Sequence, residues 1–361
     1  MAAALSALPY AWPGAAAAPI ALVPHGHSAL FGYAAAVLAG FLLTALPNWT
    51  GRPPAPAPLR RSLLGLWLLG RVAPLGTAEA AALAPFTDAA LASLLALTAA
   101  VYVGLSRNAK NVKTALVLAV YAGAAWWAAF RIGADLDPGP ALRAGVASVV
   151  GLIVIIGGRM TPGFTKAWLL ARGRCDLPVW FGRLDLLANV ATAAALAAWV
   201  VAPAGAVTAA VLLAAAYLQA ARLARWRGTA VLSVPELLGL HGGYAFVPLG
   251  LGAAALAAVA PNAVALDAPL HAWTVGAFGT TACAVMSRAV EGHFGAPRHA
   301  RTFLWVALGC IGAAGVLRLG AGAWDAAPFL VLSAGALWTA GHLAFLAGYG
   351  PTLVSRGRAP F

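Results

Sequence analysis

Apolar residues follow one another in long runs that are separated by short polar gaps. An apolar run of about 19 residues is long enough to cross a lipid bilayer as an α-helix. The pattern predicts roughly eleven such spans, at residues 28–46, 62–77, 89–105, 113–131, 141–158, 184–202, 204–223, 235–259, 268–287, 302–320 and 326–348. Many of them are rich in Ala and Gly, which let helices pack closely. The predicted fold is therefore all-α, a polytopic transmembrane helical bundle.

The first residues do not continue this pattern. Residues 1–24 contain no Lys or Arg, and prolines interrupt any helix there. The basic segment that begins a signal peptide is missing. The sequence thus predicts an uncharged N-terminal tail over residues 1–24 and a single transmembrane helical domain over residues 25–361.

The basic residues alternate from gap to gap. Cytoplasmic loops of membrane proteins retain Lys and Arg. The gaps after the first, third, fifth, seventh and ninth spans, together with the C-terminal tail, hold most of the 23 Lys and Arg residues. The other gaps keep only Arg71, Arg131, Arg143 and Arg318. This pattern predicts an N-terminus outside the cell and a cytoplasmic C-terminus.

Composition excludes several classes of protein. With 62% hydrophobic and 9% charged residues, the chain is not a soluble protein. Its net charge of +13 is scattered between apolar runs, so we expect no nucleic-acid partner. The three cysteines have no paired spacing that would indicate a disulfide framework or a zinc site. No phosphate-binding loop and no nucleophile elbow occurs.

Histidines are the strongest candidates for chemistry inside the bundle. A charge at the centre of a membrane helix costs about 2.5–3.5 kcal/mol, whereas a neutral imidazole is tolerated and is a common ligand of haem iron and copper. The candidate ligands are His25, His27, His241 and His271, with His293 and His342 as secondary candidates.

The local sequence leaves two interpretations open for each candidate. His25 and His27 precede a long helix, and they would diverge by about 200° if the backbone there is a regular helix. His241 is followed by two glycines, and His271 by Gly276 and Gly279, which would admit another helix or a flat cofactor. The alternatives are interfacial polar residues, hydrogen-bonded structural histidines and, for His293, an ordinary basic loop.

Four strings carry a resemblance to a known family: HGHSALFGYAAAVLAGFLLTALPNWTGRPP, GGRMTPGFTKAWLLARG, LHGGYAFVPLGLG and LHAWTVGAFGTTACAVMSRAVEGHFG. They resemble, in order and in spacing, the NnrS family of bacterial membrane proteins linked to the nitric oxide response. The resemblance implies a multi-pass protein of the cytoplasmic (inner) membrane that binds haem and copper and protects against nitrosative stress. It also implies that His25, His27, His241 and His271 occupy the family's recurring histidine positions.

Two features depart from the family. Its members usually have twelve spans, one more than this chain shows. The HxH string is commonly followed by a Glu-Met pair, where this chain has Ser28 and Ala29, so a role that needs a carboxylate beside these histidines is in doubt.

The leading functional hypothesis is a haem- and copper-binding membrane protein that binds or turns over nitric oxide, with an unknown electron donor. The haem would be non-covalent, because no CxxCH motif occurs. The alternative is a cofactor-free permease for a metal ion or small solute, and a third hypothesis is a structural or signalling subunit. No general acid/base pair is visible, so the sequence does not decide whether the protein is an enzyme.

Overall fold

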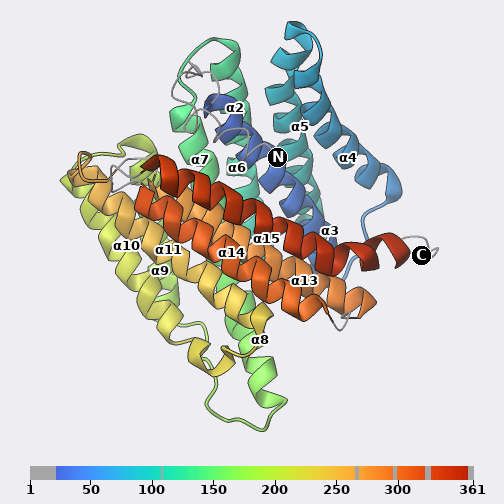
Figure 1. Cartoon of the computed structure of the whole chain (residues 1–361), viewed down its shortest axis with the longest axis vertical. Helices are drawn as coiled ribbons and strands as arrows, with labels where there is room; N and C mark the ends of the chain where they lie inside the picture. Colours follow the sequence, from blue (N-terminus) through green and yellow to red (C-terminus); the bar gives the residue numbers. More distant parts are fainter. Residues whose placement is uncertain (1–21, 107–108, 265–267, 296–298, 322–326, 357–361) are drawn as a thin grey trace. The chain divides into compact units, whose positions relative to one another are not determined.

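The computed structural model describes residues 22–106, 109–264, 268–295, 299–321 and 327–356 (Figure 1). These residues form helices joined by short loops, and no strand occurs among them. The chain divides into two compact units, which are described separately. We call Ala17–Ile155 the N-terminal unit and Ile156–Phe361 the C-terminal unit. The single domain over residues 25–361 stays a prediction, and residues 1–21 of the predicted tail lie outside the described residues.

The N-terminal unit begins with a helix that changes its winding. The π-helix η2, which is wider than an α-helix, lies between two α-helical segments. The elements of this unit are α2 (Leu22–His27), η2 (Ser28–Ala34), α3 (Ala35–Thr50), α4 (Ala57–Val72), η3 (Ala73–Leu75), α5 (Ala78–Ser106), η4 (Ala109–Asn111), α6 (Val112–Gly133) and α7 (Gly139–Leu152). A second π-helix, η5 (Ile153–Gly157), follows α7 at the boundary of the units.

The C-terminal unit contains a third π-helix, η7, and the long neighbouring helices α14 and α15 (Figure 1). Its elements are α8 (Gly158–Leu170), α9 (Arg183–Val201), α10 (Ala206–Ala224), η6 (Gly228–Val231), α11 (Pro235–Val259), α12 (Ala268–His271), η7 (Ala272–Gly279), α13 (Thr280–Phe294), α14 (Ala300–Ala321) and α15 (Ala327–Arg356). The helices α9, α10 and α11 pack consecutively against one another.

The length and apolarity of these helices make the chain a multi-pass membrane protein. Within the described ranges, nine helical stretches are long and apolar enough to cross a bilayer. The two other predicted spans are also helical. One of them, α4, has only 16 residues. The other, α12–η7–α13, carries polar residues such as His271 and Thr274 within its length.

The helix ends differ from the predicted spans in two places that matter for the site. Within the described residues, α2 begins at Leu22, inside the predicted tail. Pro24 is compatible with this start, because a proline in the first helical turn loses no intrahelical hydrogen bond. The basic gap expected after residue 158 begins with a helix, α8, which has Pro162 inside it. Its charges suggested a loop, but its other face buries Thr161 and Thr165.

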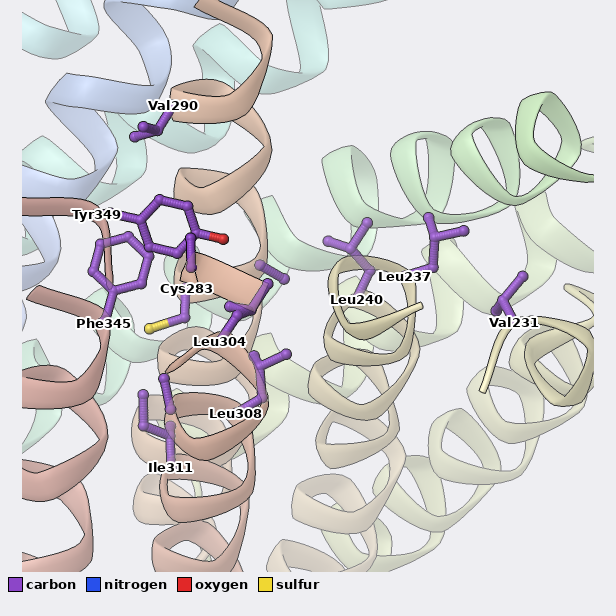
Figure 2. Packing of buried hydrophobic residues seen from close by; sticks show 13 residues of the cluster. Val231, Leu237, Leu240, Cys283, Val290, Leu304, Leu308, Ile311, Phe345 and Tyr349 are labelled. Carbon is purple, nitrogen blue, oxygen red and sulfur yellow. The ribbon is translucent and has the colours of Figure 1, made fainter. Parts of the chain in front are cut away.

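Apolar side chains from η6, α11, α13, α14 and α15 of the C-terminal unit form one core cluster (Figure 2). Leu237 and Leu240 of α11 belong to this cluster, and both side chains are buried. On α15, the rings of Phe345 and Tyr349 stack with their centroids 4.9 Å apart. Because Leu240 directly precedes His241, this packing fixes the height and rotation of α11 where the histidine lies.

Candidate functional site

His27 is the last residue of α2, directly before the π-helix η2, and its side chain is buried. Its Nδ1 lies 3.5 Å from Oδ2 of Asp88 on α5. One face of the ring is covered by Phe31, with ring centroids 5.2 Å apart. The N-terminal unit therefore holds an imidazole against a buried carboxylate in an apolar setting.

The π-helix that follows His27 is held by donors from two other helices. Trp67 Nε1 donates to the carbonyl of Gly32 at 3.2 Å, and Arg71 Nη1 donates to the carbonyl of Ser28 at 3.4 Å. The hydroxyl of Tyr121 donates to the carbonyl of Leu30 at 2.6 Å. These bonds occupy carbonyl groups along the widened turn, and they thereby fix the direction in which His27 leaves α2.

Arg71 and Asp88 form an ion pair beside His27. Arg71 Nη2 donates a hydrogen bond to Oδ2 of Asp88, the oxygen that also faces His27. Two glycines make room for the pair. A Cβ on Gly32 would overlap the guanidinium of Arg71, and a Cβ on Gly70 would meet the carboxylate of Asp88. The pair therefore fits only because both positions are glycine. The carboxylate of Asp88 also offsets the charge of the guanidinium, which is costly inside a membrane.

Several polar atoms of this group are buried without a hydrogen-bond partner. They are Nε2 of His27, Oδ1 of Asp88 and Nε of Arg71. An unsatisfied buried polar group costs about 1–3 kcal/mol, so such an atom often marks a place where a ligand binds. A neutral His27 that carries its proton on Nδ1, the nitrogen 3.5 Å from Oδ2 of Asp88, would present the Nε2 lone pair. A carboxylate behind a histidine is the usual support of a metal ligand, so His27 fits an iron or copper ligand.

The structure does not bring His25 and His27 to one face. Both lie in the regular helix α2, where residues two apart point about 200° away from each other. His25 is half-buried, whereas His27 is buried. A shared site for the two imidazoles therefore has no support from the backbone, and His25 as a ligand stays a prediction.

His241 occupies a separate buried position on α11 in the C-terminal unit. Its Nε2 lies 3.0 Å from Oγ1 of Thr165 on α8. The same hydroxyl donates to the carbonyl of Thr161 at 2.9 Å. The ring of Trp226 stands edge-on to His241, with centroids 6.4 Å apart. The neighbouring Gly243 does not leave a slot for a flat cofactor, because the side chain of Thr281 fills the space in front of it.

A buried polar network holds the side chains next to His241. Arg222 is 1% exposed and donates to Asp185 at 2.8 Å, to Asn189 at 2.9 Å and to the Tyr244 hydroxyl at 2.8 Å. The ring of Tyr244 in turn lies 4.5 Å from that of Trp226. Since the donors and acceptors of this network are paired with one another, its role is to fix the rings that pack against His241.

His271 precedes η7, and the guanidinium of Arg318 lies against its ring. Arg318 Nη2 lies 3.0 Å from Nδ1 and 2.9 Å from Nε2 of His271. The glycines that follow pack closely, with Phe246 in front of Gly276 and Trp338 in front of Gly279. His271 as a metal ligand stays a prediction, and the two glycines that follow it pack against aromatic rings.

The remaining candidates lie apart from these positions. His342 Nδ1 lies 2.9 Å from the carbonyl of Trp338, whose ring lies tilted against the imidazole with centroids 4.2 Å apart. His293 is exposed near the end of α13. In the part of the chain that the structure describes, no group of three or more His, Cys, Asp or Glu side chains comes together as a metal cluster.

Sequence reasoning missed the residues that support the two buried histidines. Asp88 and Arg71 were assigned to gaps between spans, and Thr165 to a basic loop. A signal was present for Asp88, because an acidic residue that adjoins a long apolar run is costly unless it is paired. No local signal identifies Thr165, since its partner lies on another helix.

A family model described as NnrS protein matches residues 1–356. A search of curated proteins found no match.

Proposed function

Since the chain belongs to the NnrS family, we propose that this multi-pass membrane protein binds haem and copper and acts in the tolerance of nitric oxide and nitrosative stress. It would do so by binding or turning over nitric oxide at a histidine-ligated metal centre. When bound, haem supplies an iron that takes nitric oxide as a ligand, and copper supplies an electron or a second coordination position.

One observation carries this proposal, the unpartnered Nε2 of the buried His27 with a carboxylate behind its Nδ1. His27 would be the iron ligand. Asp88 would accept the Nδ1–H and so keep the lone pair on Nε2. Arg71 would hold the carboxylate in place and keep it ionised beside the apolar ring of Phe31.

The decisive experiment is an optical spectrum of the detergent-solubilised protein, before and after nitric oxide, with elemental analysis of the same sample. We expect a Soret band that shifts on addition of nitric oxide, and copper in the preparation. If cells are supplied with haem and copper and the purified protein still has neither a Soret band nor copper, the proposal is excluded. If such a protein carried solute into proteoliposomes and lost uptake in His241→Ala, the permease hypothesis would replace it.

We also propose that the protein lies in the bacterial inner membrane with its N-terminus outside and its C-terminus in the cytoplasm. Cys175 tests the orientation, because it is exposed in the basic segment between α8 and α9. A membrane-impermeant maleimide should label it in inverted vesicles and not in intact cells, and Cys175→Ser should remove the label. Labelling from the outside would reverse the orientation.

A further inference from the structure

The segment that joins α8 to α9 exposes three consecutive large apolar side chains. Val179, Trp180 and Phe181 are 52%, 74% and 55% exposed, and they belong to no helix. They lie in the loop that follows α8 at the bottom of Figure 1. A run of exposed apolar side chains in a loop marks a surface that binds a membrane or a partner.

The backbone places this segment where two spanning helices end. The Val179 N–H donates to the carbonyl of Arg225 at 3.2 Å, and Arg225 is the first residue after α10. At the other end of the segment, the Gly182 N–H donates to Oδ2 of Asp185 at 2.9 Å, directly before α9 begins. Both α9 and α10 are long and apolar enough to cross a bilayer. The two aromatic side chains between these anchors therefore lie at the level of the lipid headgroups, where indole rings are common.

Two cations flank these aromatic side chains. The ammonium of Lys166 on α8 lies 3.9 Å from the centroid of the Trp180 ring. This contact holds a long, flexible side chain over the ring. Arg183 is exposed at the first position of α9, two residues after Phe181. The loop thus combines apolar side chains with two positive charges that lie close to them in the fold or in the chain.

The carboxylates of this region are already paired with other residues. Asp176 is bound by Arg174 at 2.6 Å, and Asp185 by Arg222 at 2.8 Å. In the part of the chain that the structure describes, neither of the two flanking cations forms an ion pair with a carboxylate. Their charges are therefore free to attract an anion.

The chemistry of an anionic phospholipid matches this combination. Its phosphodiester accepts hydrogen bonds from an ammonium and a guanidinium, and its acyl chains cover apolar side chains next to the headgroup. Anionic lipids attract basic segments that lie within a few ångströms of the membrane surface. Because the segment is fixed to the ends of two spanning helices, headgroups reach it more readily than a soluble acidic protein does.

We infer that Lys166, Trp180 and Arg183 form a binding site for the headgroup of an anionic phospholipid, and that Val179 and Phe181 insert among the lipids beside it. Lys166 and Arg183 contact the phosphate, and the Trp180 ring holds the ammonium in place. The site requires neither haem nor copper, so it is tested independently of the proposed metal centre.

Lys166→Gln/Arg183→Gln tests the site, with Arg60→Gln/Arg61→Gln as its matched control. The control removes the same two charges from exposed positions in the first turns of α4. Native mass spectrometry of each purified full-length protein measures the binding of phosphatidylglycerol and of phosphatidylcholine. We expect the wild type to bind phosphatidylglycerol at least about tenfold more tightly than phosphatidylcholine. The test variant should lose this preference, and the control should keep it within about twofold.

Trp180→Ala provides a second line that leaves the charges in place. Without the ring that holds Lys166, the preference for phosphatidylglycerol should fall about threefold. Phe329→Ala is the control, because Phe329 is also 74% exposed but lies near the start of α15. It should leave the preference unchanged.

A spin label at Phe181→Cys, in a Cys175→Ser/Cys310→Ser background, reports where the segment lies. In nanodiscs that contain phosphatidylglycerol, we expect the label to be accessible to oxygen and shielded from a water-soluble nickel complex. A label that is open to water in these nanodiscs but shielded in native membrane vesicles would indicate a protein partner instead of a lipid. That result would overturn the inference. Equal binding of the two lipids by the wild type, or an equal loss of preference in the control pair, would also overturn it.

Discussion

The regions around His27 and His271 share local sequence features, but the arginine near each histidine is bound differently. In each, the histidine directly precedes a π-helix, and a glycine follows at the fifth position, Gly32 and Gly276. In each, an arginine from a following helix approaches the histidine. Arg71 is bound by the carboxylate of Asp88, whereas Arg318 lies against both ring nitrogens of His271.

This difference shows that the local sequence does not decide whether a histidine can bind a metal. In the N-terminal unit, one carboxylate takes up the guanidinium charge and orients the imidazole, so Nε2 is left for a ligand. In the C-terminal unit, the guanidinium of Arg318 lies against the ring of His271, 3.0 Å from Nδ1 and 2.9 Å from Nε2. A metal at His271 would first have to displace that contact.

The largest expected effect separates the two histidines directly. His27→Ala should lower the haem content of the purified protein by at least about tenfold, because it removes the proposed iron ligand. His271→Ala should change it by less than about twofold, since that ring is engaged by Arg318. The Soret absorbance per protein measures both. Equal losses in the two variants would abolish the contrast between the two regions.

Asp88→Asn should have the next largest effect, since the amide cannot neutralise Arg71 or orient His27 as strongly. We expect haem affinity to fall about 10–100-fold, the usual loss when the partner of a metal-bound histidine is removed. Haem titration of the apoprotein measures it. Asp185→Asn is the control, because Asp185 pairs with Arg222 and contacts no histidine. It should lower thermal stability and keep haem affinity, and equal affinity losses would reduce Asp88 to a general structural role.

Arg318→Gln asks whether the guanidinium keeps His271 from binding a metal. The amide is neutral and shorter, so the ring nitrogens of His271 should become available. We expect a gain of weak metal binding, seen as additional copper bound at high copper concentration and lost again in Arg318→Gln/His271→Ala. The haem content should stay within about twofold of wild type. No additional copper would mean that packing, and not the arginine, keeps the site closed.

The smallest effect concerns the anchoring of η2. Tyr121→Phe removes the hydrogen bond to the carbonyl of Leu30, so the thermal stability of the N-terminal unit should fall by about 1 kcal/mol with a small loss of haem affinity. Tyr102→Phe is the control, because its bond to the carbonyl of Pro53 is exposed. It should leave both quantities unchanged. A Tyr121→Phe protein as stable as wild type would show that the π-helix does not need this donor.

Much of the fold follows from the apolar runs alone. The predicted span 235–259 agrees with α11 (Pro235–Val259) at both ends, because a proline starts it and a single apolar run continues to its end. The site is different. If every charged residue is assigned to a loop, Arg71 and Asp88 fall in gaps between spans. In the structure, Arg71 lies on α4 and forms an ion pair with Asp88 on α5. Sequence periodicity carries no information on such a pair.

The orientation of each imidazole was equally beyond the sequence. Neither a short HxH string nor a lone buried histidine shows in the sequence whether Nδ1 or Nε2 is left unbound. For His27 the answer depends on Asp88, and these two residues lie on helices that are distant in the chain. Only the folded arrangement brings them together.

The widened turn after His27 also sets the helical phase of everything that follows it. A π-helix is equivalent to one residue inserted into an α-helix, and each α-helical residue rotates by about 100°. Removing one residue from η2 would restore regular winding, so α3 would keep its buried Leu38 and Leu42 only by turning His27 away from Asp88. After a single-residue deletion in η2, the protein would therefore still insert into the membrane. It would not bind the proposed haem, so it would lack the haem absorbance.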